Sequence, residues 1–349
     1  MLFRSNLEFI ALFIKVLTQK RTANITQLSN ILNPNAEKTS NKRRCRRFLK
    51  KQRNWQTQIA AWILSFYPND IMLVLDRTEW MIGKTPVNFL VLALTIKKFS
   101  FPLTFSLLDK EGSSSTAEVT TLVKTVLTWF LNRRVLLLAD REFLSQDLLK
   151  FLTKIGWDFN CRLKKNARVS YKGNTAQPEQ WFTNLLKGQG TWLKRKVYIY
   201  GVPVYLVGIR LHKPTEDGDE FVFVVTNRCP SAALGLYSYR WGIENLFASL
   251  KSRGFNLEAT RIRCSVRLKN LLSLLTIAVF WAYQCGELIS SYKPIRVLAH
   301  SRLEQSVFRV GLDALERFLC GGRVNGVCWV EVLELLSFNS EVFSRWDSS

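Results

Sequence analysis

The chain of 349 residues is strongly basic, with 50 lysines and arginines against 27 aspartates and glutamates and a formal net charge of +23. Apolar residues make up 47% of the sequence, which is enough to bury a sizeable core and excludes a disordered chain. At roughly 100–200 residues per domain, two or three structural units fit this length. The charge indicates a polyanionic partner, either nucleic acid or an anionic membrane surface.

Several classes of protein are excluded by what the sequence lacks. The only histidines are His212 and His300, so a His-rich zinc site and an H-E-x-x-H metalloprotease are absent. The seven cysteines are scattered without a C-x-x-C pair, and no secretory signal is visible, so we expect reduced and mostly buried thiols in a cytoplasmic protein. The longest apolar run, 271–283, is shorter than the about 20 residues that span a bilayer, and we expect a buried helix and no membrane partner.

The N-terminal region is predicted to be a small helical unit with a basic face. Apolar residues at helical spacing predict helices over 6–17 and 24–32, the second with Asn24 as a possible cap. Residues 38–53 hold nine lysines and arginines and no acid, and a further amphipathic helix fits 54–66. Region 1–70 is therefore expected to be a helical unit with a concentrated basic face, which the family resemblance described below implies to be a DNA-binding region.

From residue 71 the pattern changes to strands. Apolar runs at 71–76, 87–96 and 101–108 with short connections predict three antiparallel strands. A helix over 115–131, a buried strand over 135–140, a helix over 144–155 and a strand over 157–163 follow. Three strands and then alternating strands and helices predict an α/β fold, in which a mixed sheet is flanked by helices.

The rest of the chain is predicted to hold an insertion and closing helices. Residues 166–230 are punctuated by Lys, Gly, Asn and Pro and contain three strand-like runs, which indicates a β-rich insertion. A helix is predicted over 233–252, and further helices over 271–283, 302–319 and 328–337. The expected domains are thus 1–70, a core of 71–165 with 231–290, the insertion 166–230, and a helical region 291–349.

Two aspartates each follow a buried apolar run and end a predicted strand, Asp76 the strand at 71–76 and Asp140 the strand at 135–140. An ionised carboxylate at such a place must be paired or bind a cation. If both converge with Glu244 of the later helix, the oxygen-only site suits Mg²⁺ or Mn²⁺. Two such ions can activate an attacking oxygen and stabilise the leaving oxygen in a displacement at phosphorus.

The same acids have a structural interpretation. An Asp at a strand end often starts a turn or caps the next helix. Asp76 and Asp140 are followed by Arg77 and Arg141, so local salt bridges are possible. Glu79 and Glu142 lie close by in sequence, and nothing in their spacing separates a supporting role from simple exposure, which we favour.

The predicted helix at 233–252 carries Tyr237, Arg240, Glu244 and Lys251 at spacings of 3, 4 and 7. At about 100° per residue this spacing places all four on one face. Glu244 would face the metals, while Arg240 and Lys251 could hold phosphate oxygens through charge-assisted bonds. The alternative is an ordinary i,i+4 ion pair between Arg240 and Glu244 on a solvated helix, with Tyr237 as surface packing.

These residues resemble a known family. The pattern Tyr237-x2-Arg240-x3-Glu244-x6-Lys251 matches the Y-R-E-K signature of the insertion-sequence-4 group of DDE transposases. The segments LVLDRTEW (73–80) and LLLADREF (136–143) resemble that group's two Asp segments. The stretches 14–32 and 300–319 are also similar to it, so the matches spread across most of the chain.

The resemblance implies an RNase H-like fold in which Asp76, Asp140 and Glu244 bind two Mg²⁺ ions, with Mn²⁺ as a possible substitute. Tyr237, Arg240 and Lys251 would contact the DNA backbone near the scissile phosphate. Some relatives wedge a tryptophan of the insertion where a base flips out. Trp181 and Trp192 lie in the insertion here, and neither aligns to that role. The implied location is the prokaryotic cytoplasm, in association with the nucleoid.

The implied partners are double-stranded DNA, at transposon terminal inverted repeats and at the target, and a second copy of the chain in the DNA complex. The basic cluster fits repeat binding, and its candidate contacts are Lys42, Arg43, Arg44, Arg46 and Arg47. The alternative is a solvated basic arm that binds any polyanion. For the whole chain, two other functions stay open: a catalytically silent DNA-binding regulator, and a structure-specific nuclease on the same fold.

Overall fold

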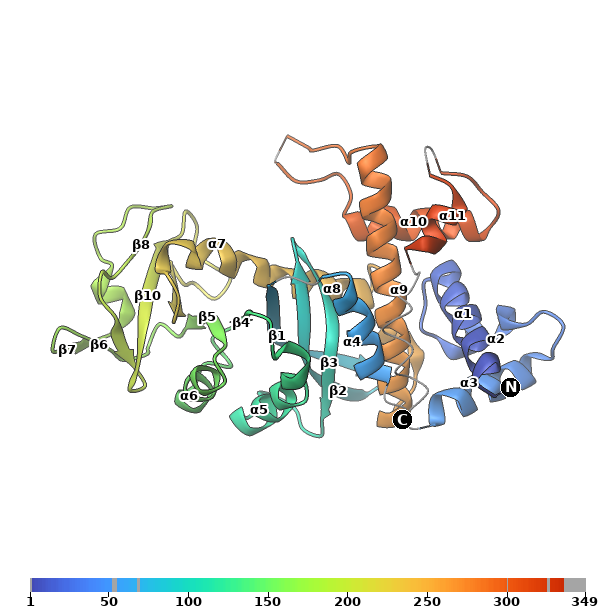
Figure 1. Cartoon of the computed structure of the whole chain (residues 1–349), viewed down its shortest axis with the longest axis horizontal. Helices are drawn as coiled ribbons and strands as arrows, with labels where there is room; N and C mark the ends of the chain where they lie inside the picture. The colour runs from blue at the N-terminus through green and yellow to red at the C-terminus, as the bar shows by residue number, and fades with distance from the viewer. Residues whose placement is uncertain (1, 52–54, 68–69, 300, 325–326, 336–349) are drawn as a thin grey trace. The chain divides into compact units, whose positions relative to one another are not determined.

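The computed structural model describes residues 2–51, 55–67, 70–299, 301–324 and 327–335 (Figure 1). Internal contacts divide the chain into two compact units. Unit 1 comprises Met1–Tyr67, Glu79–Val87 and Leu246–Ser349, and unit 2 comprises Pro68–Thr78 and Asn88–Asn245. The division into four regions, which rests on changes in the sequence pattern, stays a prediction.

The N-terminal part of unit 1 is helical, as predicted. Its helices are α1 (Leu2–Lys20), α2 (Ile25–Leu32), α3 (Lys38–Lys50) and α4 (Trp55–Ser65). Asn24 caps α2, since its side chain accepts bonds from the backbone N–H groups of Thr26 and Gln27. The basic cluster forms α3, whose apolar side turns inward with Cys45, Phe48 and Leu49 buried. Residues 52 and 53 of the cluster lie outside the described residues.

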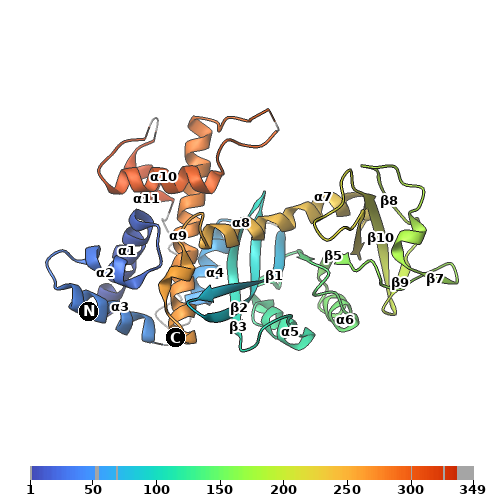
Figure 2. The same ribbon diagram turned by 180° about the vertical axis from the view of Figure 1, so that it is seen from behind.

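The C-terminal part of unit 1 is built on α9 (Ser265–Tyr292), with α10 (Val307–Leu319) and α11 (Trp329–Glu334). The predicted apolar run 271–283 lies inside α9, which extends beyond it at both ends. By length and composition α9 could cross a membrane, but 78% of its most apolar window is buried inside the protein, as in a core helix. The helix α10 crosses α9 at close range (Figure 2). The close approach is possible because Gly311 and Gly286 have no Cβ atom, and a Cβ atom at either position would overlap the backbone of the other helix.

The described strands form one 11-stranded sheet. The first five are β1 (Ile71–Ile82), β2 (Thr85–Ile96), β3 (Phe99–Leu108), β4 (Val135–Ala139) and β5 (Asp158–Leu163). Their spatial order is β3-β2-β1-β4-β5, with β2 and β3 antiparallel and β1, β4 and β5 parallel to one another. The predicted mixed sheet is confirmed, and this order of strands is that of an RNase H-like core.

The predicted β-rich insertion is also found, but its strands continue the main sheet. They are β6 (Val169–Tyr171), β7 (Asn174–Ala176), β8 (Gly190–Trp192), β9 (Val197–Ile199), β10 (Val202–Arg210) and β11 (Phe221–Thr226). The last strand, β11, pairs antiparallel with β5, and β10 pairs with β11. The predicted run 191–200 is not one strand, because it divides into β8 and β9.

Unit 2 places helices against these strands. The helix α5 (Thr116–Lys124) starts at a capping box of Ser115 and Glu118 and is followed by a 3₁₀ turn, Leu127–Phe130, so the helix predicted over 115–131 is divided. The helix α6 (Gln146–Lys154) packs beside α5 and against β5 (Figure 1). The helix α7 (Ala233–Tyr237) packs against β5 and β11.

Two sequence predictions near the candidate site are wrong in detail. The strand β1 does not stop at Asp76 but continues to Ile82, so Asp76 lies in mid-strand. The single helix predicted over 233–252 is interrupted: α7 ends at Tyr237, a 3₁₀ turn covers Ser238–Arg240, and α8 runs from Trp241 to Leu250. The interruption changes the rotation per residue, so the uniform 100° spacing does not hold across the four signature residues.

Candidate active site

The two candidate aspartates are neighbours because of strand register. Leu75 of β1 is the direct partner of Ala139 of β4, and the two strands are parallel. Asp76 and Asp140 each come one residue later, so both lie at the same level of adjacent strands, which run about 4.8 Å apart. The sheet therefore brings together two carboxylates that are 64 positions apart in sequence.

Glu244 reaches the site from the first turn of α8, which is held close to the hairpin between β2 and β3. A Cβ atom on Gly242 would lie 2.8 Å from the Ser100 hydroxyl and 3.1 Å from the backbone carbon of Phe99, so only glycine fits there. The Asn245 amide donates to the Lys98 carbonyl oxygen at 2.7 Å. Gly242 and Asn245 flank Glu244, and their contacts with residues 98–100 set the distance between the start of α8 and the hairpin of β2 and β3. Sequence reasoning missed both.

Arg240 connects two of the three acids. Its Nη1 lies 3.2 Å from Asp76 Oδ2, and its Nη2 lies 2.7 Å from Glu244 Oε1. The predicted i,i+4 pair with Glu244 is thus present, and the contact with Asp76 comes in addition to it. Burial opposes the charged form of Arg240, but Tyr237, Asp76, Asp140 and Glu244 together raise its pKa, so the guanidinium stays charged.

The third acid, Asp140, is contacted by Tyr237 and approached by Arg162 of β5. The Tyr237 hydroxyl donates to Asp140 Oδ1 at 3.3 Å, and the Arg162 Nη1 lies 3.9 Å from the same oxygen. Burial raises the pKa of Tyr237, so this side chain keeps its proton and acts as a donor. The structure therefore adds Arg162 to the site, a residue that the sequence motifs do not single out.

The carboxyl group of Asp76 is perturbed by its surroundings. Its side chain is 18% exposed, and burial raises its pKa to about 6, although Arg240 and the backbone N–H of Arg77 act in the opposite direction. Asp140 and Glu244 add to the increase, which shows that the three negative charges affect one another. Partly buried carboxylates that lie close together are stabilised by a nearby positive charge, and here Arg240 supplies it.

The residues that follow the two aspartates pair elsewhere. The Arg77 Nε lies 2.9 Å from Glu142 Oε1, so the segments that carry Asp76 and Asp140 are joined by a second contact. Glu142 is 28% exposed and ion-paired, so its predicted exposure is wrong, since the neighbouring strand supplies a partner that spacing along the chain cannot show. Glu79 is exposed, as predicted.

A cluster of cations around Asp219 lies beside Asp140. Asp219 is 5% exposed and contacts Arg141 at 2.7 Å, Lys165 at 2.9 Å and Arg162 at 3.2 Å. The hydrogen bond from Lys165 lowers the pKa of Asp219, with Arg141 and Arg162 acting in the same direction. The loop that precedes β11 thus holds Arg162, which in turn faces Asp140.

The remaining candidates have other contacts or exposed positions. Lys251 belongs to unit 1, one residue beyond α8, and donates to the Glu79 carbonyl oxygen at 3.3 Å. Trp181 packs edge-on against Tyr171, and Trp192 is an exposed residue of β8. The five basic candidates of the N-terminal cluster lie on α3 of unit 1, and four of them are exposed: Arg43, Arg44, Arg46 and Arg47.

The predicted metal ligands are not arranged as a ligand set. Over the described ranges, no three or more His, Cys, Asp or Glu side chains are grouped so as to hold a metal ion. Arg240 instead pairs with Asp76 and Glu244, and Asp140 accepts the hydrogen bond of the Tyr237 hydroxyl. The donor types nevertheless suit a hard divalent cation, because all three are carboxylates whose charges already interact.

Comparison with known proteins gives both the class of enzyme and the family. The model of the transposase DDE domain matches residues 73–281, which is more than half of the chain and includes Asp76, Asp140 and Glu244. The chain therefore belongs to the transposase DDE domain family, whose members are phosphoryl-transfer enzymes that use divalent metals. No curated protein matches the chain.

Among solved structures, the chain is similar to a piggyBac transposase, seen by cryo-electron microscopy in a synaptic complex with hairpin DNA. The sequence identity is 13% and the TM-score is 0.40. The match covers 80% of this chain and spans 57% of the length of that one.

Proposed function

We propose that this protein is a transposase of the Y-R-E-K type, which cleaves DNA at terminal inverted repeats and joins the freed ends to target DNA. The family match supports the reaction class. The observation that carries the proposal is that Arg240 contacts both Asp76 and Glu244, while Tyr237 contacts Asp140. Three signature residues and two strand aspartates, which come from separate parts of the sequence, form one connected group.

Asp76, Asp140 and Glu244 are the proposed ligands of two Mg²⁺ ions, for which Mn²⁺ can substitute. When bound, these ions would polarise the attacking oxygen and stabilise the leaving oxygen in an in-line displacement at phosphorus. Arg240 would then exchange its two carboxylate contacts for phosphate oxygens, which its two terminal N–H groups can bind together. Tyr237 keeps its proton, so it would orient a phosphate oxygen as a donor.

Other parts of the chain would hold DNA away from the reacting phosphate. The exposed arginines of α3 fit contacts with the DNA backbone of the terminal repeat. Lys251 would contact the backbone near the scissile bond. We further propose that two copies of the chain assemble on paired transposon ends, which sedimentation with and without repeat DNA would test: a monomer under both conditions would contradict it.

The test of function is nicking of a plasmid that carries the DNA bordering this reading frame, with its inverted repeats, in the presence of Mg²⁺. Asp76→Asn, Asp140→Asn and Glu244→Gln should each reduce nicking by at least a hundredfold and leave DNA binding within a few-fold. The matched controls are Asp109→Asn and Glu179→Gln, which change exposed acids of unit 2. Nicking that needs no repeat would indicate a structure-specific nuclease, and binding without nicking would indicate a regulator.

A further inference from the structure

Unit 1 contains a basic cleft of about 520 Å³, between the start of α2, the helix α3 and the segment that leads into α9. None of the described residues that line it is acidic. Five lining side chains are cationic: Lys42 and Arg46 of α3, and Arg261, Arg263 and Arg267 of the segment 260–267. A cleft of this size accommodates a nucleotide-sized group rather than a single small ion.

The positive charges of this basic cleft have no acidic partner among the residues that the structure describes. Across the described ranges, none of the five cations forms an ion pair, and the buried Arg267 Nε has no hydrogen-bond partner. Thr260, which also lines the cleft, is 4% exposed, and its Oγ1 likewise has no partner there. A buried polar atom without a partner costs about 1–3 kcal/mol, so both atoms indicate a ligand with acceptor oxygens.

The start of α9 adds to the attraction for anions. Cys264 is its capping residue, lines the cleft and makes no side-chain bond to the first turn. The N-terminus of this 28-residue helix therefore presents its positive dipole end without a capping side chain. The start of α2 differs, because Asn24 already accepts the amides of its first turn.

The two walls of the basic cleft are fixed to each other. Asn270 of α9 is 3% exposed, and its Nδ2 donates to the carbonyl oxygens of Leu49 at 2.8 Å and Lys51 at 2.7 Å, at the end of α3. The spacing of the cations on α3 and on the segment 260–267 is thus set before any ligand binds, which reduces the entropic cost of binding.

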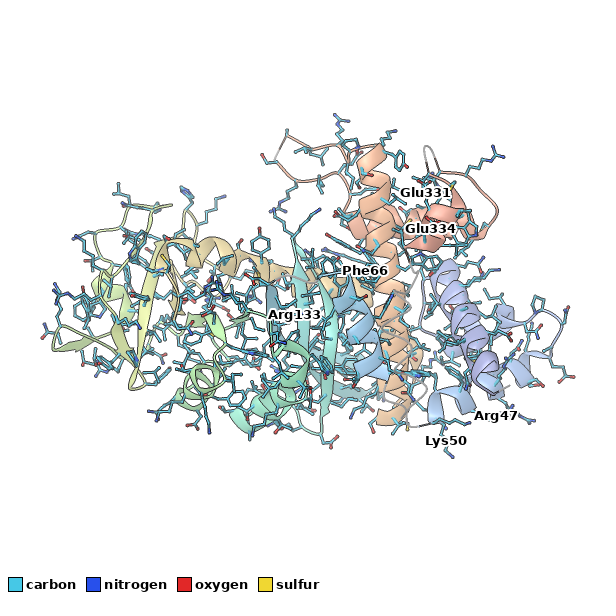
Figure 3. All side chains as sticks on the ribbon, in the orientation of Figure 1. Arg47, Lys50, Phe66, Arg133, Glu331 and Glu334 are labelled. Atoms are coloured by element: carbon cyan, nitrogen blue, oxygen red, sulfur yellow. The ribbon has the colours of Figure 1, made fainter. Side chains whose placement is uncertain are left out.

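A second hollow of about 420 Å³ continues the charge along α3. It is lined by Ser40, Arg43, Arg46 and Arg47, so Arg46 borders both hollows. Figure 3 shows Arg47 and Lys50 projecting outward from the same helix. Two adjacent hollows that share a cation can bind several anionic groups in a row, so they fit a polymer with regularly spaced anions better than a single anion.

We propose that the basic cleft binds consecutive phosphodiester groups of a DNA strand, with Arg263 and Arg267 on the α9 side acting together with Lys42 and Arg46 on the α3 side. This inference rests on the proposed function in that DNA is the ligand. It adds the segment 260–267, outside the signature and outside the basic cluster, as a DNA contact.

The experiment measures binding of the full-length chain to a fluorescein-labelled 30-base-pair duplex at 50–300 mM KCl without divalent ions. The variants are Arg263→Gln and the double variant Arg46→Gln/Arg263→Gln, both at exposed positions that should not affect folding. The controls remove the same charge outside the cleft, with Arg323→Gln and Lys150→Gln/Arg323→Gln. The slope of log affinity against log salt should fall by about 0.9 for each phosphate group that a cleft variant no longer binds, and stay unchanged in the controls.

A second measurement uses Cys264 as a reporter inside the basic cleft. Saturating duplex should slow alkylation of Cys264 by at least tenfold, while the exposed Cys320 and Cys328 react as before. Equal salt slopes in cleft and control variants, or equal labelling of Cys264 with and without DNA, would overturn the inference. Inorganic phosphate at matched ionic strength that protects Cys264 as fully as the duplex would also overturn it, in favour of a free-anion site.

Failure of this inference is distinguishable from failure of the proposed function. If the wild-type chain nicks repeat DNA while the cleft variants bind like the controls, only the inference fails. If the cleft variants change the salt slope while no Mg²⁺-dependent nicking occurs, the inference holds and the transposase proposal fails.

Discussion

The Arg240 guanidinium lies 3.2 Å from the Asp76 carboxylate, although the two residues are 164 positions apart in sequence. This contact joins a strand of the sheet to the turn that precedes α8. Because the same guanidinium also holds Glu244, Arg240 compensates two carboxylates that would otherwise repel each other. One charged group therefore links β1 to the first turn of α8.

Arg240→Lys should reduce Mg²⁺-dependent nicking by more than tenfold. A lysine has one point charge and cannot bond two carboxylates in the planar manner of a guanidinium. Arg240→Ala should have the larger effect and lower the free energy of unfolding by about 2 kcal/mol, because hydrogen bonds to charged groups are removed. Nicking assays and thermal melts check this, with Arg195→Ala as an exposed control in the same unit. Equal activity of Arg240→Lys and wild type would contradict it.

Gly242→Ala should reduce nicking and lower the free energy of unfolding by about 1–3 kcal/mol, as other cases of overpacking do. The added Cβ atom would lie 3.1 Å from the backbone of Phe99, which cannot move as a flexible side chain does, so α8 and Glu244 must shift. The matched control is Gly235→Ala in α7, where a Cβ atom meets nothing within 4 Å. That control should gain about 0.5–1 kcal/mol from helix propensity. If Gly242→Ala and Gly235→Ala show the same nicking activity and the same stability, the close approach of Gly242 to Phe99 does not position Glu244.

The local elements were predictable from the sequence because each depends on a short pattern. Continuous apolar runs, which are typical of buried strands, predicted β1, β2 and β4. The capping residue Asn24 predicted the start of α2. The break at Ser238–Arg240 was not predictable, since no proline marks it and Gly235 lies outside it. Tertiary packing of α7 on β5 and β11 decides where that helix ends.

The candidate acids were also predictable, and so was the i,i+4 pair of Arg240 with Glu244, but the contacts of Arg240 with Asp76 and of Tyr237 and Arg162 with Asp140 were not. Asp76 and Asp140 were identified by their place after apolar runs, and the register of β1 and β4 explains why they meet. Arg162, Asp219 and Gly242 gave no signal, because their roles come from contacts between segments far apart in sequence. A motif can indicate candidate residues, whereas the contacts that hold those residues depend on pairing between distant segments.

Asp219→Asn should lower the free energy of unfolding at pH 7 by about 2 kcal/mol, because three cations lose a charged acceptor. The hydrogen bond from Lys165 lowers the pKa of Asp219 below its ordinary 3.8. The stabilising effect is therefore complete above that value and is lost as the pH falls through the lower folded pKa. Melts at pH 7, 5 and 3 should show the difference between variant and wild type shrinking only at the lowest pH.

The control for this prediction is Asp217→Asn. Asp217 contacts the same Arg141, but its side chain is 64% exposed, so the loss should stay below about 1 kcal/mol. A loss at Asp217 as large as at Asp219 would show that burial does not set the strength of this cluster.

Cysteine alkylation should separate the seven thiols by burial. Burial raises the pKa of Cys45 to about 11 and the pKa values of Cys161 and Cys285 to about 12, so at pH 8 these three hold almost no reactive thiolate. The exposed cysteines are Cys229, Cys264, Cys320 and Cys328. Hydrogen bonds from Ser231 lower the pKa of Cys229, so it should react first. Mass spectrometry after brief iodoacetamide treatment should find four labelled sites in the native protein and seven after denaturation. Rapid labelling of Cys161 in the native protein would mean that β5 is not a buried strand beside Asp140.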